Sequence, residues 1–84
     1  MNSKHRRTLG AIFERPTRPD IPWRDVEALS AALGGTVENG KGSRRRVALG
    51  EKRASFHEPH PEKVTDLGAV VHVREFLISV GIKP

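Results

Sequence analysis

Alternating apolar and polar residues in the middle of the chain predict a β-hairpin. The apolar positions of the two runs are Val47, Leu49, Ala54 and Phe56. The positions between them are Arg44, Arg46, Arg53, Ser55 and His57. Gly50 and Glu51 separate the runs, and a glycine in the first position suits a two-residue type II′ turn because that position requires a positive φ. The pattern therefore predicts two strands with one apolar face and one cationic face.

Apolar residues at helical spacing predict three helices. The first carries Leu9, Ile12 and Phe13 and ends before Pro16. The second begins at Pro22, ends at Gly34 and Gly35, and has an apolar stripe of Val26, Leu29 and Leu33. The third runs from about Thr65 to Val80, with Thr65 or Asp66 as its amino cap. Its predicted stripe is Leu67, Val70, Val73, Leu77 and Val80.

A short strand over residues 36–38 completes the predicted order of helix, three strands and helix. This order indicates a small two-layer α+β domain, in which both helices cover one face of a three-stranded antiparallel sheet. We expect this domain to span residues 21–84. Residues 1–20 are expected to form an extra N-terminal helix and a proline-containing linker. The other face of the sheet is left open.

The charge of the chain indicates what this open face binds. Among 84 residues there are 15 Lys and Arg and 10 Asp and Glu, which give a net charge of +5 and favour polyanionic partners such as nucleic acid. The chain has no cysteine, so disulfides and thiolate metal sites are excluded. No run approaches the roughly 18 apolar residues of a membrane span. We therefore expect a soluble, cytoplasmic protein with no membrane partner.

Two further motifs carry weak chemical signals. Residues 39–43, NGKGS, lack the spacing of a phosphate-binding P-loop, so we interpret them as a flexible turn, with phosphate binding as the alternative. His57, His60 and His72, with Glu58 or Glu62, offer atoms that can bind a metal, but their spacing is not that of a zinc site. We expect neither a metal nor a small-molecule cofactor.

Taken in order, these segments are similar to the HicA family of bacterial toxins, over residues 21–83. The matching pieces are the helix over residues 23–34, the Gly42-Ser43 pair that opens the second strand, the sequence FHEPHP over residues 56–61, and the helix over residues 66–82. The resemblance implies a fold like that of double-stranded RNA-binding domains, with the order α-β-β-β-α. It also implies metal-independent cleavage of translated mRNA, and silencing by a HicB-type antitoxin that covers the active site.

The chain departs from the family at one position. The family places its catalytic histidine directly after the Gly-Ser pair, where this chain has Arg44. Arginine stays protonated and cannot act as a general base, whereas imidazole exchanges protons near neutral pH. His57 and His60 are therefore the candidate catalytic residues, and strand alternation favours His57 because it places that residue beside the arginines. The predicted RNA contacts are Lys41, Ser43, Arg44, Arg45, Arg46, Arg53 and Lys63.

Three functions remain open from the sequence. The first is an endoribonuclease toxin that acts on mRNA and is neutralised by a HicB-like antitoxin. The second is an RNA-binding module of the same fold that has lost its chemistry at Arg44. The third is an interaction protein whose basic face docks an acidic partner.

Overall fold

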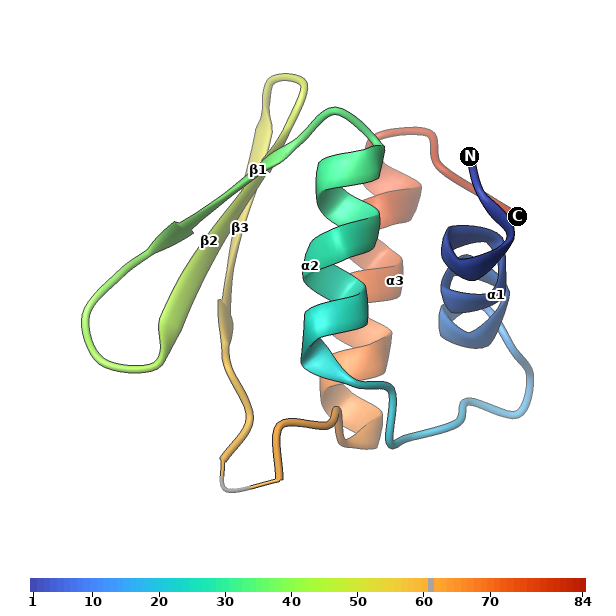
Figure 1. The fold of residues 1–84 in the computed structure, drawn as a ribbon, viewed down its shortest axis with the longest axis horizontal. Coiled ribbons are helices and arrows are strands. Elements are labelled where there is room, and N and C mark those ends of the chain that lie inside the picture. The colour runs from blue at the N-terminus through green and yellow to red at the C-terminus, as the bar shows by residue number, and fades with distance from the viewer. Residues whose placement is uncertain (61) are drawn as a thin grey trace.

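The computed structural model describes residues 1–60 and 62–84. Its elements, in chain order, are α1 (Ser3–Ile12), α2 (Trp23–Ala32), β1 (Thr36–Asn39), β2 (Arg44–Leu49), β3 (Lys52–His57) and α3 (Leu67–Ser79). The sheet forms one outer layer, α2 and α3 lie behind it, and α1 lies on their far side (Figure 1). The predicted α+β class, with helices on one face of a three-stranded sheet, is confirmed. The N-terminal helix adds a third layer.

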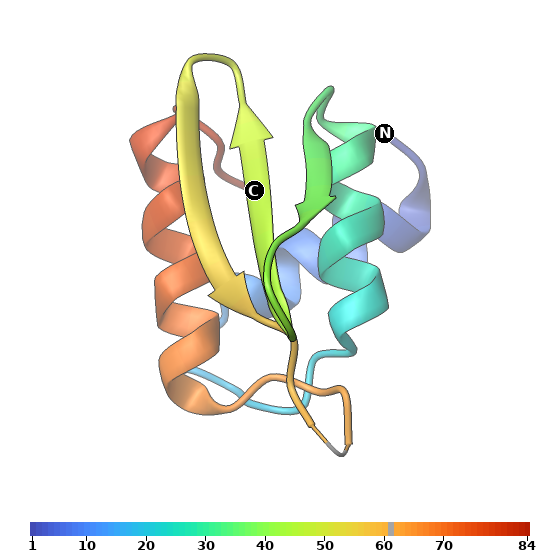
Figure 2. The ribbon, with the colours of Figure 1, turned by 90° about the vertical axis from the view of Figure 1, so that its left-hand side faces the viewer.

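The sheet is antiparallel, in the order β1-β2-β3. Gly50 has a φ of +60°, as the predicted turn requires, and the turn pairs Leu49 with Lys52. Val47 pairs with Ala54 on the face that packs against the helices, so the predicted apolar face is confirmed. Figure 2 looks onto the opposite face, which no helix covers.

The connection from α2 into β1 requires glycine. Gly34 has a φ of +88°, a conformation that other residues rarely adopt, and it ends the helix as predicted. A Cβ added to Gly35 would collide with the carbonyl oxygen of Ala48 and the side chain of Leu49. The chain therefore passes from helix to sheet in close contact with β2.

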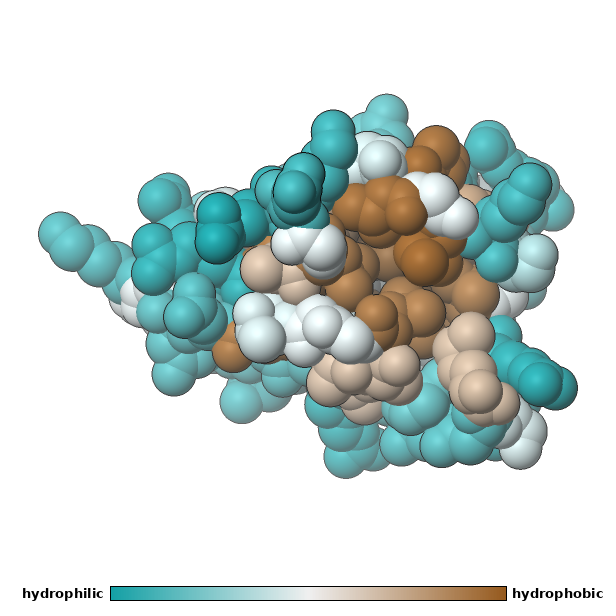
Figure 3. All heavy atoms as spheres, turned by 90° about the horizontal axis from the view of Figure 1, so that it is seen from above, coloured by the Kyte–Doolittle hydropathy of each residue, from teal (hydrophilic) through white to brown (hydrophobic). Residues whose placement is uncertain are grey.

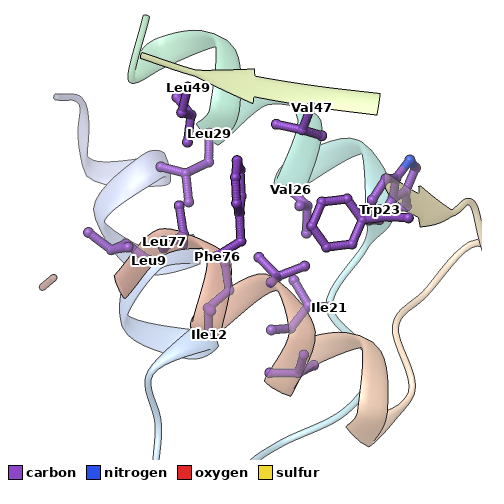
Figure 4. Packing of buried hydrophobic residues seen from close by; sticks show 13 residues of the cluster. Leu9, Ile12, Ile21, Trp23, Val26, Leu29, Val47, Leu49, Phe76 and Leu77 are labelled. Atoms are coloured by element: carbon purple, nitrogen blue, oxygen red, sulfur yellow. The ribbon is translucent and has the colours of Figure 1, made fainter. Parts of the chain in front are cut away.

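One apolar core joins all three layers (Figure 4). Its members are Leu9, Ile12, Ile21, Trp23, Val26, Leu29, Val47, Leu49, Phe56, Val70, Val73, Phe76 and Leu77. Because Leu9 and Ile12 belong to α1, the core continues across the predicted boundary near residue 20. The prediction that Leu67 lies in the α3 stripe is wrong, since 52% of this residue is exposed. Leu67 is the first residue of α3, and at this amino-terminal end of the helix it lines an open groove.

A buried arginine ties α1 to α3. The Arg74 Nε donates a hydrogen bond of 2.9 Å to the carbonyl of Ile12, the last residue of α1. One of its terminal nitrogens donates to the Thr17 hydroxyl at 2.9 Å and to the Glu14 carbonyl at 3.4 Å. A cation is favoured at the carboxyl end of a helix, where carbonyl groups lack partners within the helix. Arg74 therefore fixes both α1 and the start of the linker.

The end of the linker is fixed to the segment that precedes α3. The Ile21 N–H donates to the Thr65 hydroxyl at 3.0 Å, and the Thr65 N–H donates to the Ile21 carbonyl at 3.0 Å. The Trp23 N–H donates to the Lys63 carbonyl at 2.9 Å. These bonds hold the β3-α3 connection against the start of α2.

The surface is divided between a hydrophilic sheet and an apolar end. Apolar side chains gather where α2 and α3 end, next to the hydrophilic side chains of the sheet (Figure 3). The caps of the two helices at this end are Leu33 and Val80, both partly buried against the core. Within the part of the chain that the structure describes, no helix has the length and apolarity needed to cross a membrane.

Candidate nucleic-acid interface

The open face of the sheet carries a cluster of cations. The strand register places Arg44 opposite His57, Arg46 opposite Ser55, and Ala48 opposite Arg53. All of the polar residues in these pairs are exposed. In residues 1–60 and 62–84, none of the three arginines forms an ion pair with a carboxylate. We call Arg44, Arg46 and Arg53 the arginine face; its guanidinium groups are available to an external anion.

Arg45 points to the opposite side of β2. It pairs with the buried Phe56, and its side chain is only 17% exposed. One of its terminal nitrogens donates to the carbonyls of Gly42 and Arg44 at 3.1 and 2.9 Å, and the other lies 3.5 Å from the Glu58 carboxylate. Arg45 is thus separate from the arginine face, and its contacts hold the start of β2 in place.

Glu58 is the centre of a polar cluster that the sequence did not indicate. Its Oε2 lies 3.5 Å from Arg45, 3.7 Å from His60 Nε2 and 4.0 Å from Lys63 Nζ. Its N–H also donates to the Ser43 carbonyl at 2.8 Å. Glu58 directly follows β3 in the sequence, and nothing in its local pattern distinguishes it from a solvated carboxylate. Glu58 brings the loop after β3 together with the loop before β2.

The two candidate histidines therefore have different surroundings. His60 faces Glu58, although 55% of its side chain remains exposed. His57 lies on the open face opposite Arg44, as strand alternation predicted. In the described residues His57 forms no ion pair. His57 is thus the candidate that lies next to the arginine face.

The remaining predicted contacts lie at one end of the sheet. Lys41 is exposed in the loop between β1 and β2, and its carbonyl accepts a hydrogen bond of 3.0 Å from the Arg44 N–H. Ser43 is half-buried next to Glu58. Lys63 belongs to the Glu58 cluster rather than to the open face. The seven predicted RNA contacts therefore divide between the arginine face, one loop and the Glu58 cluster.

A groove of about 930 Å³ begins beside His57 and runs between the end of β3 and the start of α3. Its lining includes His57, His60 and, from α3, His72. The His72 ring lies 4.4 Å from that of Phe56, centroid to centroid. In residues 1–60 and 62–84, no three histidine or acidic side chains are grouped as metal ligands would be.

Comparison with protein families gives one match, to HicA toxins of bacterial toxin–antitoxin systems, over residues 23–81. The match spans more than half of the chain. The chain belongs to the HicA toxin family. No curated protein and no solved structure matches it.

The HicA match bears on the geometry in two ways. It begins at Trp23 and ends at Gly81, so it includes the arginine face, the Glu58 cluster and α3 but leaves out α1. It also includes Arg44, the position at which the family resemblance implies a catalytic histidine. Arginine cannot act as a general base, and the cross-strand partner of Arg44 is His57.

Proposed function

We propose that this chain is the toxin of a type II toxin–antitoxin pair and that it acts as a metal-independent endoribonuclease on mRNA in the cytoplasm. The observation that carries the proposal is the open sheet face, where the arginine face adjoins the exposed His57 and its three arginines form no ion pair within residues 1–60 and 62–84. Membership of the HicA family supports the toxin role. A HicB-like antitoxin neutralises the chain by covering this face.

Arginine suits the phosphate-binding part of this function. Guanidinium groups form charge-assisted hydrogen bonds to phosphate oxygens and remain charged at any physiological pH. Arg44 and Arg46 alternate with Arg45 along β2, so they project from the same face and follow one backbone. Arg53 adds a third cation from β3. Lys41, in the neighbouring loop, is a fourth proposed phosphate contact.

The proposed cleavage uses His57 as the proton-transfer group. The His57 imidazole accepts the proton of a ribose 2′-hydroxyl, and the 2′-oxygen attacks the adjacent phosphorus. The bond from phosphorus to the 5′-oxygen breaks, and the leaving oxygen takes a proton from the imidazolium or from water. Arg44, paired opposite His57, stabilises the negative charge that develops on the phosphate. The products are a 2′,3′-cyclic phosphate and a 5′-hydroxyl.

His60 is the second candidate for this role. Its Nε2 faces the Glu58 carboxylate at 3.7 Å, an arrangement that orients the ring. A catalytic His60 would have to act from the loop rather than from the open face. We therefore assign proton transfer to His57 and a supporting position in the Glu58 cluster to His60.

An RNA-binding module without catalysis is the second candidate function, and the arginine at position 44 favours it. Growth of bacteria that express the chain, with and without a HicB-like antitoxin, tests the toxin role directly. Arrest that the antitoxin relieves is the expected result. In vitro, wild type and Arg44→His are compared on one mRNA with chelator present. If wild type binds the mRNA without cutting it and only Arg44→His cuts it, the chain is the binding module.

A further inference from the structure

The groove between β3 and α3 has an aromatic floor that the proposed cleavage does not use. The Phe56 ring centroid lies 4.4 Å from that of His72 and 5.9 Å from that of Trp23, and all three residues line the groove. Phe56 and Trp23 are buried, whereas His72 is exposed. The Trp23 indole N–H is already used in a 3.1 Å hydrogen bond to Glu27. The imidazole ring of His72 therefore packs against Phe56 and remains exposed to a ligand in the groove.

An exposed leucine forms another part of the lining. Leu67 is 52% exposed and lines the same groove. Besides His72, the charged and titratable residues of the lining are His57, His60, Asp20, Glu62 and Asp66. Asp66 accepts a hydrogen bond of 2.7 Å from the Ala69 N–H at its Oδ1. Apolar contacts combined with a few polar groups match a planar heteroaromatic ligand, whose faces are apolar and whose edges form hydrogen bonds.

The groove is continuous with the arginine face. His57 connects the two, because it lines the groove and pairs with Arg44 across β2 and β3. Side chains directly opposite each other in an antiparallel sheet have Cβ atoms about 4.5–5.5 Å apart. A ligand with its ring in the groove would therefore place an attached phosphate within reach of Arg44.

We propose that this groove binds one unpaired nucleobase of the RNA substrate, with the base against His72 and Leu67 and the adjoining phosphates along Arg44 and Arg46. The proposal rests on the proposed function, since it takes RNA as the ligand of the arginine face. RNA fits better than a protein segment because the groove adjoins the arginine face through His57, and the three arginines of that face form no ion pair in residues 1–60 and 62–84. Its volume of about 930 Å³ also falls in the range of roughly 300–1,000 Å³ typical of small-molecule sites.

This site would make the toxin select single-stranded RNA. A base inside a duplex is stacked on both faces and cannot enter a side groove, whereas an unpaired base can leave the stack. Base selection would then act next to His57, the proposed proton-transfer group. The nucleotide held in the groove would determine which phosphate reaches the arginine face.

Titration of isotope-labelled protein with four nucleoside 5′-monophosphates, and separately with ribose 5-phosphate, tests the proposal by NMR. At least one nucleotide is expected to shift the signals of His72 and Leu67, whereas ribose 5-phosphate should shift only those of the arginine face. Loss of one stacking ring in His72→Ala should weaken nucleotide binding roughly 5- to 150-fold. Binding of ribose 5-phosphate should not change. Ile78→Ala, an exposed change elsewhere on α3, is the matched control.

Equal shifts of His72 and Leu67 with ribose 5-phosphate and with the nucleotides would overturn the base site. Unchanged nucleotide affinity in both His72→Ala and Leu67→Ala would overturn it as well. So would NMR signals of the groove residues that shift with an antitoxin but with none of the nucleotides. In each of these cases wild type can still bind and cut RNA, so the proposed function would stand. A wild type that neither binds nor cuts RNA would overturn both.

Discussion

Replacing Leu77 by alanine is expected to remove a large part of the stability of this domain, whereas the same change at its neighbour Ile78 is not. Leu77 is 2% exposed and Ile78 is 54% exposed, although both are β- or γ-branched aliphatic residues on α3. A buried Leu→Ala change costs about 2–5 kcal/mol, because transfer free energy is lost and a cavity remains. An exposed change usually stays within about 0.5 kcal/mol. A chain of this length has a total stability of roughly 4–13 kcal/mol.

Urea unfolding followed by circular dichroism measures both variants against wild type. At about 4–8 °C per kcal/mol for a domain of this size, Leu77→Ala should also lower the Tm by at least about 8 °C. Ile78→Ala should stay within a few degrees of wild type. Equal unfolding midpoints for the two variants would show that α3 does not present the Leu77 side to the core, and the packing described above would be refuted.

Three further changes test other parts of the fold and site. Arg74→Met leaves the carbonyls of Ile12 and Glu14 unpaired, so we expect the free energy of unfolding to fall by about 1–3 kcal/mol. Backbone amides in α1 should then exchange hydrogen faster than those in β2, and equal exchange in both elements would contradict the anchoring role. Gly35→Ala should lower the unfolding midpoint, because the added methyl group meets the backbone of β2, and an unchanged midpoint would refute that close approach. Each Ala change on the arginine face should flatten the salt dependence of RNA binding by about 0.7 units per phosphate contact, whereas Arg6→Ala on α1 should not. A slope unchanged in the triple variant would exclude phosphate contacts on the arginine face; its substitutions are at Arg44, Arg46 and Arg53.

The sheet could be predicted from the sequence because its signals are local. A period of two assigns each residue of a strand to one face, and the turn at Gly50 fixes which residues pair. These two facts place His57 on the arginine face and opposite Arg44, as observed. The caps of α2 and α3 are local signals as well, and of the two predicted amino caps of α3, Thr65 and Asp66, it is Asp66 that accepts a hydrogen bond of 2.7 Å from the Ala69 N–H.

Contacts between distant segments could not be predicted in this way. Arg74 bonds to Ile12 across 62 positions, and nothing in its own helix distinguishes it from a solvated arginine. Glu58 gathers its three cations through the conformations of two loops, which propensities do not specify. The same limit applies to Arg45. Strand alternation predicts that its side chain lies on the inner face of the sheet, but the pairing with Glu58 depends on how the chain folds.

The groove shows a different kind of limit. Helical spacing placed Leu67 in the core, but the residue is exposed at the start of α3. The spacing of apolar residues shows which side of a helix is buried, and it does not show how far along the helix the neighbouring elements cover that side. The groove also combines Trp23, Phe56 and His72, which come from three elements far apart in the sequence. Each of them has an ordinary structural explanation in its own element. The proposed base site rests on their arrangement in space.

Single-turnover cleavage of an mRNA by wild type and His57→Ala, with chelator present and RNA affinity measured in parallel, tests the central claim most directly. We expect the cleavage rate to fall by a factor of roughly 10²–10⁴ while the Kd stays within about twofold, because the imidazole acts in the transition state. His60→Ala, in the same assay, should retain more activity than His57→Ala. Cleavage by His57→Ala at the wild-type rate would contradict the assignment of proton transfer to the histidine on the arginine face.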